Sequence, residues 1–183
     1  LSIHPFVMQL DDDVILLPHT LASLYETLIE MGSGNVLAPF FLNQQTGDEI
    51  TKPKDGFRAW AGNMYASFIL GAPFGRRRYG TISPAGIGFG VIMNSGPIRV
   101  VESEWLPGGA ALSHKSDLII NNYYPFEGKA YCEDLIHSIL WRKRGCRLWT
   151  LLDSYAMVDV TNESLKWRSL VSRFRDHKYV ANM

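Results

Sequence analysis

The first fifty residues alternate between apolar runs and short polar breaks, a pattern typical of strands and helices joined by turns. Residues 5–10, PFVMQL, form a continuous apolar run that predicts a buried strand ending at three aspartates. The next segment predicts a helix, because Pro18 is typical of a helix start and Gly32 and Gly34 of a helix end. Its apolar positions recur at helical spacing, and we expect them to face the core: Leu21, Leu24, Tyr25, Leu28 and Ile29.

The middle of the chain is less regular. Residues 35–43, NVLAPFFLN, predict a second strand, and the polar run 43–49 predicts a turn. Residues 53–98 are rich in Gly, Pro and Arg and predict loops and short strands. Within them, the apolar stretch 64–75 predicts a buried strand or loop, although it could also contact a membrane surface.

The last third returns to a periodic pattern. Residues 133–145 predict an amphipathic helix with a basic last turn and Gly145 as its cap, and four apolar side chains are expected to point inward: Leu135, Ile136, Ile139 and Leu140. Residues 146–152 predict a strand, and 163–175 a final basic helix. The alternation of strands and helices indicates an α/β fold.

Composition indicates one domain with a hydrophobic core, since 46% of the 183 residues are hydrophobic. The formal net charge of zero gives no reason to expect nucleic acid as a partner. The charge is unevenly placed, because residues 1–50 hold seven acids and no Lys or Arg, whereas the rest holds 18 basic and 11 acidic residues. This asymmetry could build a site for a cation and a polyanion, or be uneven surface charge. The two cysteines predict reduced thiols and a cytoplasmic protein.

Asp11, Asp12 and Asp13 are the first candidate for chemistry. Like charges side by side repel one another, and here they follow an apolar strand, where open α/β sheets bind ligands. On an extended backbone Asp11 and Asp13 would point to the same side and Asp12 to the other. Two carboxylates on one side suit Mg²⁺ or Mn²⁺, usually together with substrate phosphates. The alternative is an acidic turn in water.

Glu133 and Asp134 are the second candidate, at the start of the predicted helix 133–145. Acids are common at helix starts because the helix dipole stabilises them, so the pair alone does not indicate chemistry. It gains weight from the upstream turn EWLPGGAALSHKS and from RKRGCRLW, which follows it.

Three segments in this order, LDDDVILLPHTL, VESEWLPGGAALSHKS and AYCEDLIHSILWRKRGCRLW, resemble the family-2 glycosyltransferases of the GT-A fold. They match the DxD motif, the W-x-x-G-G loop and the E-D-x-x-x-x-x-x-x-R-x-x-G helix of that family. The resemblance covers about residues 3–152, and 153–183 would be a basic, helical C-terminal segment of the same single domain.

The resemblance implies a nucleotide-sugar donor (UDP-, GDP- or dTDP-linked), Mn²⁺ or Mg²⁺ as cofactor, and inversion at the anomeric carbon. It places Asp11 near the ribose, with Asp12 beside it in the donor site, and makes Asp13 the ligand of a metal that bridges the diphosphate. Asp134 would be the general base and Glu133 its neighbour in the acceptor pocket. An adjacent carboxylate and partial burial should raise one pKa of this pair.

The acceptor side of the resemblance rests on the W-x-x-G-G loop. Gly108 and Gly109 would let the backbone approach a sugar, which we expect to be part of a glycan or a lipid-linked acceptor. Trp105 offers a face for a sugar ring or belongs to the core. Arg142, in the E-D helix, and the tripeptide Arg76-Arg77-Arg78 could contact phosphate, and the tripeptide could equally be a solvated loop.

The chain also departs from the family. His114 and Lys115 stand where an Arg is frequent, no His follows the last strand, and the Q-x-x-R-W signature of processive synthases is absent, so we expect addition of one sugar. In the family a βαβαβ unit precedes the DxD strand. We therefore expect an inactive acceptor-side portion of a larger enzyme, with its exposed first strand covered by a second copy or another element. We expect it to act in the cytoplasm, where it could lie at the inner face of the membrane.

Two other classes stay open. Haloacid dehalogenase-like phosphatases also have a strand that ends in D-x-D, but they favour Thr or Val where this chain has Ile15. A non-catalytic carbohydrate- or partner-binding module of the same fold is the other alternative.

Overall fold

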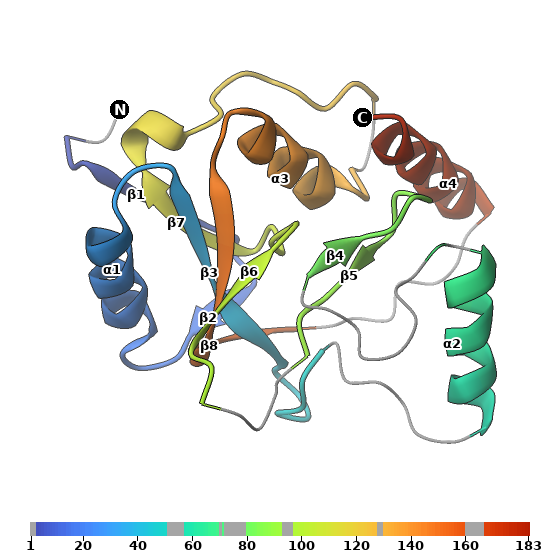
Figure 1. The fold of residues 1–183 in the computed structure, drawn as a ribbon, viewed down its shortest axis with the longest axis horizontal. Helices are drawn as coiled ribbons and strands as arrows, with labels where there is room; N and C mark the ends of the chain where they lie inside the picture. The colour runs from blue at the N-terminus through green and yellow to red at the C-terminus, as the bar shows by residue number, and fades with distance from the viewer. Residues whose placement is uncertain are drawn as a thin grey trace.

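The computed structural model describes residues 3–50, 57–69, 71, 80–92, 97–127, 130–159 and 167–183. Its elements are β1 (Phe6–Leu10), β2 (Val14–Leu16), α1 (Thr20–Met31), β3 (Asn35–Asn43), α2 (Phe57–Ile69), β4 (Thr81–Ile82), β5 (Gly88–Phe89), β6 (Val100–Ser103), β7 (Ala110–His114), the 3₁₀ turn η1 (Lys115–Asp117), α3 (Glu133–Lys143), β8 (Arg147–Val158) and α4 (Trp167–Ala181). Figure 1 shows a central sheet with α1 on one side and α3 on the other, while α4 lies near the small β4–β5 hairpin.

The central sheet is mixed and has the order β1-β7-β3-β8-β2, with β6 also paired to β8. Strands β3 and β8 are parallel, and β7 lies antiparallel between β1 and β3. It follows that β1, β3 and β8 point the same way, so their carboxyl ends lie at one edge of the sheet. That edge is where α/β sheets commonly bind ligands.

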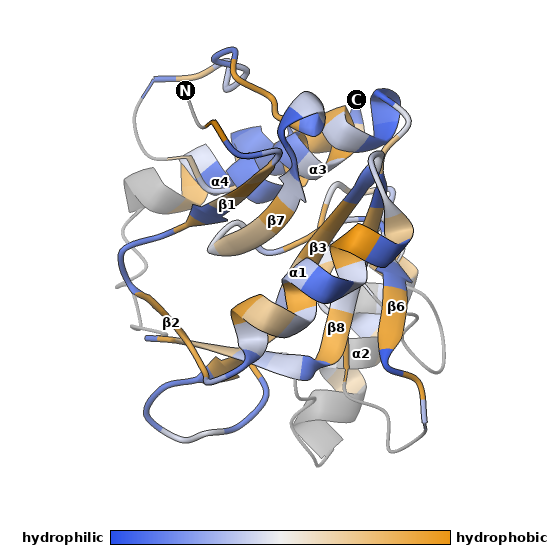
Figure 2. Cartoon of the chain, turned by 90° about the vertical axis from the view of Figure 1, so that its left-hand side faces the viewer, coloured by the Kyte–Doolittle hydropathy of each residue, from blue (hydrophilic) through white to orange (hydrophobic). Residues whose placement is uncertain are grey.

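Alternating side chains of β3 cover both faces of the sheet. Leu37 packs against Leu24 and Leu28 of α1. Its neighbour Val36 points to the opposite face, into the cluster that contains Trp141 of α3. Figure 2 shows the first face, where α1 lies across apolar strands. Because successive side chains of a strand face opposite ways, a strand buried on both sides reads as one continuous apolar run.

Several sequence predictions are confirmed. The fold is α/β, and β3 spans the predicted 35–43. α1 and α3 lie within the predicted helical segments. The backbone of Gly32 and Gly145, which follow these helices, has positive φ, a conformation that favours glycine. Both cysteines are free and buried.

The predicted apolar stripe of α1 is only partly buried. Leu24 and Leu28 are fully buried, but Leu21, Tyr25 and Ile29 are 50%, 44% and 52% exposed. The helix sits over the sheet on a narrower face than the spacing predicted. In α3, likewise, Ser138 and Trp141 are buried together with Leu135 and Ile136, while Ile139 and Leu140 are half-buried.

Other element predictions were wrong in type or extent. Residues 57–69, predicted as loop or strand, form helix α2, whose Tyr65, Phe68 and Ile69 are exposed. The strand predicted at 146–152 continues to Val158, so the start of the segment 153–183 is strand and not helix. The last helix, predicted at 163–175, is described from 167 and runs to 181.

The predicted buried strand at 5–10 is instead a half-buried edge strand. In the described part of the sheet β1 pairs only with β7. Its other edge therefore presents unpaired backbone groups, as expected for an exposed strand.

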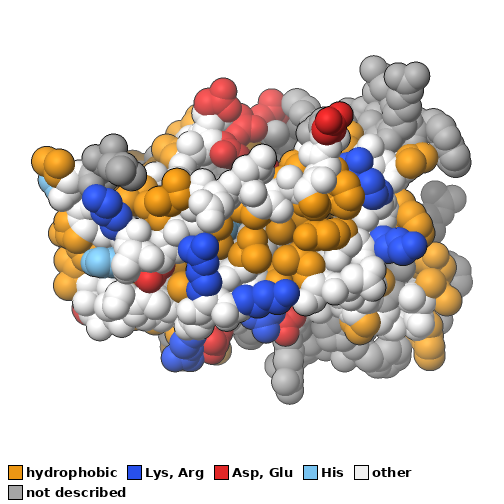
Figure 3. Space-filling view, turned by 90° about the horizontal axis from the view of Figure 1, so that it is seen from above, with side chains coloured by type: hydrophobic (Ala, Val, Ile, Leu, Met, Phe, Trp, Pro, Cys, Tyr) orange, Lys and Arg blue, Asp and Glu red, His pale blue; other side chains and the backbone are white. Residues whose placement is uncertain are grey.

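The surface carries charges of both signs. On the face shown in Figure 3, Lys and Arg side chains are spread out and apolar surface lies between them. Within the described ranges, no helix is both long and apolar enough to cross a membrane.

Candidate functional site

The aspartates form a turn at the carboxyl end of β1. The N–H of Asp11 donates to the carbonyl of Gly109 (2.9 Å), which extends the pairing of β1 with β7, and the N–H of Val14 donates back to the carbonyl of Asp11 (3.3 Å). The chain then enters the short strand β2 before α1 begins. The extended geometry predicted for these aspartates was therefore wrong.

The turn nevertheless separates the three side chains as predicted. All three residues are exposed, but Asp11 and Asp13 line the same pocket, whereas Asp12 lines none of the pockets described here. This pocket is also lined by Phe40 and Phe41 of β3 and by Val158 at the end of β8. It lies at the edge where the three parallel strands end.

The second pair of acids starts α3. The N–H of Leu135 donates to Oδ1 of Asp134 (2.8 Å), and the preceding Cys132 gives the helix no side-chain cap. The W-x-x-G-G loop packs against this helix, because the N–H of Leu106 donates to Oγ of Ser138 (3.0 Å). The sequence predicted that the loop and the acid pair lie together, and the structure brings them together.

A side chain would crowd the site at Gly109 but not at Gly108. A Cβ on Gly109 would lie 2.8 Å from Cγ2 of Val14, closer than real Cβ contacts, and one on Gly108 would lie 3.4 Å from Cβ of Asp134. Trp105, half-buried, lines the pocket of Asp11 and Asp13 and donates its indole N–H to the carbonyl of Phe89 (3.1 Å).

Two pockets share part of their lining, which we call the wall between them. The smaller, of about 270 Å³, contains Asp11 and Asp13, and the larger, of about 630 Å³, contains Asp11 and Glu133. Four residues line both pockets: Asp11, Pro107, Gly109 and Asp134. The wall thus joins the aspartate turn, the Gly-Gly loop and the start of α3, which are far apart in sequence.

The carboxylates of the wall have raised pKa values. Burial, together with the nearby charge of Glu133, raises the pKa of Asp134 to about 6, although backbone N–H groups that donate to this carboxylate oppose the shift. Burial also raises the pKa of Asp11, and the charges of Asp13, Asp12 and Glu133 add to the effect. A carboxylate with a pKa near neutrality suits a general base, and the repulsion around Asp11 would be relieved by a cation.

Asp11 and Asp13 are the candidate metal ligands in the smaller pocket. Among the described residues, no group of three or more His, Cys, Asp or Glu side chains is placed to hold an ion. Asp11 and Asp13 share a pocket, and this donor set fits Mg²⁺ or Mn²⁺ when substrate phosphates supply further oxygens.

One cluster in the larger pocket was missed from the sequence. The Tyr123 hydroxyl donates to Oε1 of Glu133 (3.2 Å), and the hydroxyl oxygen of Tyr123 also lies 3.0 Å from Nδ1 of His137. Since a hydroxyl has one proton, Nδ1 of His137 must carry a proton and donate it to Tyr123. His137 also stacks on Trp141, with ring centroids 3.8 Å apart. The spacing of His137 and Trp141 along a helix was the available signal.

The histidine and the tyrosine of this cluster each have one protonation state at pH 7. Burial lowers the pKa of His137 to about 4, and the charge of Arg144 adds to the effect, so the imidazole is neutral at pH 7. Burial and the Glu133 carboxylate raise the pKa of Tyr123, so its hydroxyl stays protonated. The cluster therefore holds one oxygen of Glu133 through the neutral hydroxyl of Tyr123, which itself accepts from neutral His137.

The arginines predicted to contact phosphate are not found in the wall between the two pockets. Arg142 is exposed in the last turn of α3, at the opposite end from Asp134, and lines neither pocket. Arg76, Arg77 and Arg78 lie outside the described residues.

Comparison with known families and with curated proteins adds no relative, because no family model and no curated protein matches the chain.

Proposed function

We propose that this chain belongs to an inverting, metal-assisted glycosyltransferase that moves one sugar from a nucleotide-sugar donor to an acceptor hydroxyl. The observation that supports the proposal best is the position of Asp134 in the wall between two pockets. One pocket holds Asp11 and Asp13, and the other holds Glu133.

In this proposal Asp134 is the general base. Its raised pKa of about 6 leaves it ionised but basic at neutral pH. The carboxylate takes the proton of an acceptor hydroxyl held in the larger pocket, and the hydroxyl oxygen attacks the anomeric carbon from the side opposite the leaving group. The bond from that carbon to the diphosphate oxygen breaks, and the nucleoside diphosphate departs with the bonding electron pair.

The smaller pocket takes the diphosphate end of the donor. Asp11 and Asp13 are the residues that would hold Mg²⁺ or Mn²⁺, which supplies Lewis-acid stabilisation of the leaving diphosphate when bound. Without a cation, two carboxylates would repel a diphosphate. Trp105 and Phe41 give this pocket aromatic walls, and aromatic faces suit the apolar faces of sugars.

The larger pocket takes the acceptor. Asn121 and Asn122 line it beside Tyr123 and Glu133, so its lining includes residues with amide, hydroxyl and carboxylate groups. Such a set can both donate to and accept from the hydroxyls of a glycan. The exposed backbone at Gly108 leaves room for a sugar next to Asp134.

The architecture is compatible with a GT-A-like fold. A mixed sheet between helices carries the aspartate turn at the carboxyl end of β1, next to the loop that precedes β7. The free edge of β1 offers a place where a nucleotide-binding βαβαβ unit, or a second copy of the chain, would add strands.

The test is release of nucleoside diphosphate from UDP-, GDP- and dTDP-sugars with Mn²⁺ and a panel of glycan acceptors. It should be run on the 183-residue chain and on the longest natural protein that contains it, and we expect turnover in the longer protein. Hydrolysis of p-nitrophenyl phosphate without release of nucleoside diphosphate would instead establish a phosphatase. Glycan binding without either reaction would establish a binding module.

A further inference from the structure

Helix α4 contacts the segments that form both pockets. We propose that α4 is a clasp that holds the walls of the two pockets in place, with Asp176 as a positioning residue for the larger pocket. The inference deepens the proposed function, and it rests on that function only where substrates are assigned to pockets.

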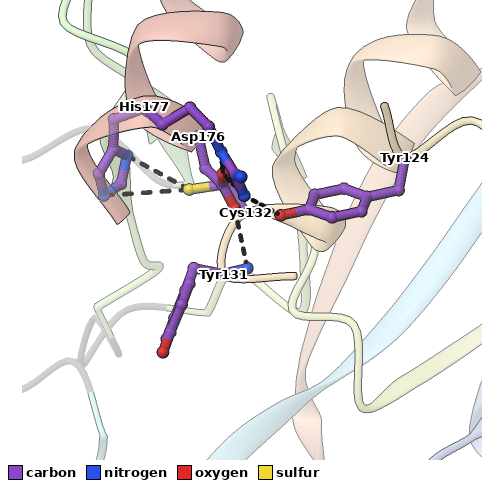
Figure 4. A network of polar contacts seen from close by, with 6 residues as sticks. Tyr124, Tyr131, Cys132, Asp176 and His177 are labelled. Atoms are coloured by element: carbon purple, nitrogen blue, oxygen red, sulfur yellow. Dashed lines mark hydrogen bonds and ion pairs between the residues drawn. The ribbon is translucent and has the colours of Figure 1, made fainter. Parts of the chain in front are cut away.

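Asp176 is the first arm of the clasp. Among the described residues it is the one charged side chain that is completely buried. Its Oδ2 accepts from the hydroxyl of Tyr124 and from the backbone N–H of Tyr131 (3.1 Å), and its Oδ1 accepts from Nε of Arg175 (3.0 Å), as Figure 4 shows. A buried carboxylate is costly unless it is paired and hydrogen-bonded, so these donors are what make its position tolerable.

One donor to Asp176, Tyr124, lines the larger pocket, and a second, Tyr131, follows a residue that lines it. Tyr124 and Ala130 line that pocket, and Tyr131 is followed by Cys132, the residue immediately before Glu133 and Asp134. Asp176 therefore fixes the segment that leads into the acid pair. Glu133 and Asp134 owe part of their placement to a helix that does not itself line the pocket.

His177 is the second arm. Its Nδ1 lies 2.9 Å from the carbonyl of Gly86, in the turn of the β4–β5 hairpin, and 3.4 Å from Sγ of Cys132. Figure 4 shows the ring beside the sulfur, next to Asp176 on the same helix. The carbonyl can only accept, so His177 donates to it from Nδ1. The residues at the ends of this hairpin, Gly80 and Gly90, line the smaller pocket.

The hairpin approaches α4 too closely for a side chain. Gly86 has φ of 72°, and a Cβ there would lie 2.2 Å from the carbonyl oxygen of His177 and 2.8 Å from the N of Ala181. A substitution at Gly86 would therefore push the hairpin from the helix without altering any side chain of α4. The contacts of Asp176 and those of His177 can therefore be weakened in separate variants.

Hydrogen exchange tests the clasp without any substrate. Asp176→Asn should speed amide exchange in peptides 121–127 and 130–136 by about tenfold, because a buried hydrogen-bond network is weakened. Gly86→Ala should do the same in peptide 80–92. Neither variant should change exchange in α1. The matched control is Glu127→Gln, which removes a carboxylate charge from an exposed position in the same segment.

Two outcomes would overturn the clasp. One is unchanged exchange in these peptides, and the other is uniformly faster exchange across the chain, which would mean general destabilisation. If Asp176→Asn does not fold, Tyr124→Phe takes its place: it removes one donor to Asp176 and keeps the ring that packs on Phe126. We expect a smaller effect on the same peptides.

Kinetics of the active enzyme then separate positioning from stability. Asp176→Asn should raise the acceptor KM by about tenfold with the donor KM unchanged, and Gly86→Ala should raise the donor KM with the acceptor KM unchanged. Equal changes in the donor KM and the acceptor KM of either variant would contradict separate roles for the two arms. Altered exchange with no glycosyl transfer in any protein would leave the clasp standing and overturn the proposed function alone.

Discussion

The backbone N–H of Asp11 donates to the carbonyl of Gly109, with 2.9 Å between the nitrogen and the oxygen. This hydrogen bond joins the first residue of the aspartate turn to the last glycine of the Gly-Gly loop. It continues the register in which Leu10 pairs with Ala110. Two motifs separated by about a hundred residues therefore share one rigid backbone frame.

Asp13→Asn should weaken Mn²⁺ binding and reduce transfer by about two orders of magnitude or more, because it removes one of the two carboxylates that would hold the metal in the smaller pocket. Titration of the longest natural protein with Mn²⁺, followed by donor turnover, measures both effects. Asp12→Asn is the matched control, since Asp12 is exposed and lines neither pocket. Equal activity of wild type and Asp13→Asn at saturating donor would contradict the metal assignment.

Asp134→Asn should abolish transfer and leave donor binding intact, because the amide has no basic oxygen for the proton but can still accept from the N–H of Leu135. In the wild-type enzyme kcat/KM should fall as the pH drops through about 6, the raised pKa of Asp134. Donor affinity by calorimetry, beside a pH profile, measures both. Parallel loss of affinity and turnover would make Asp134 a binding residue.

The same raised pKa has a consequence for stability with a definite sign. Between the ordinary carboxyl pKa of 3.8 and about 6, the folded protein binds more protons at Asp134 than the unfolded chain does. This group's contribution to the free energy of unfolding is therefore present at low pH and lost as the pH rises through about 6. Asp134→Asn should remove that pH dependence, and the variant should be at least as stable as wild type at pH 8 in urea titrations.

Gly109→Ala should destabilise the fold by about 1–3 kcal/mol, because its Cβ would meet Cγ2 of Val14 at 2.8 Å and ring atoms of Phe41 at 3.4 Å and beyond. Gly108→Ala is the matched control: its Cβ would meet Cβ of Asp134 at 3.4 Å, an ordinary contact. Urea unfolding of the two variants measures the difference. Equal urea midpoints for the two variants would show that the close packing at Gly109 is not needed for stability.

Tyr123→Phe should raise the acceptor KM by about three- to tenfold with little change in donor KM, because Glu133 loses the hydroxyl that orients its Oε1. His137 loses the same partner. Tyr25→Phe, at an exposed position of α1 on the other face of the sheet, serves as the control. A change in kcat alone, with both KM values unchanged, would mean that Tyr123 acts in the chemical step rather than in acceptor binding.

The sequence predicted the elements whose pattern is local and missed those decided by tertiary contacts. β3 was predicted to the residue because a strand buried on both faces reads as an unbroken apolar run. Leu21 and Ile29 fit the helical spacing equally well, yet the flat sheet beneath α1 covers only Leu24 and Leu28 fully. Helical periodicity gives a face of the helix, but not how wide a face its partner covers.

The same division holds for the candidate site. The resemblance implied that Asp134 and the Gly-Gly loop lie together on the acceptor side, and in the structure they are neighbours. The common pocket of Asp11 and Asp13 was predicted for the wrong reason, since a turn and not a pleated strand places them. Tyr123 and Asp176 were missed because each becomes informative only through partners distant in sequence.

Because the two pockets share a wall, a ligand in one pocket would change the proton affinity of a carboxylate that also lines the other. As transfer proceeds, the departing nucleoside diphosphate would gain a negative charge in the smaller pocket, next to Asp134, and so raise the affinity of this carboxylate for the proton that it takes from the acceptor. Ejection of the diphosphate would return Asp134 to its weaker hold on the acceptor's proton, so departure of one product would prepare the base to release what it took from the other substrate.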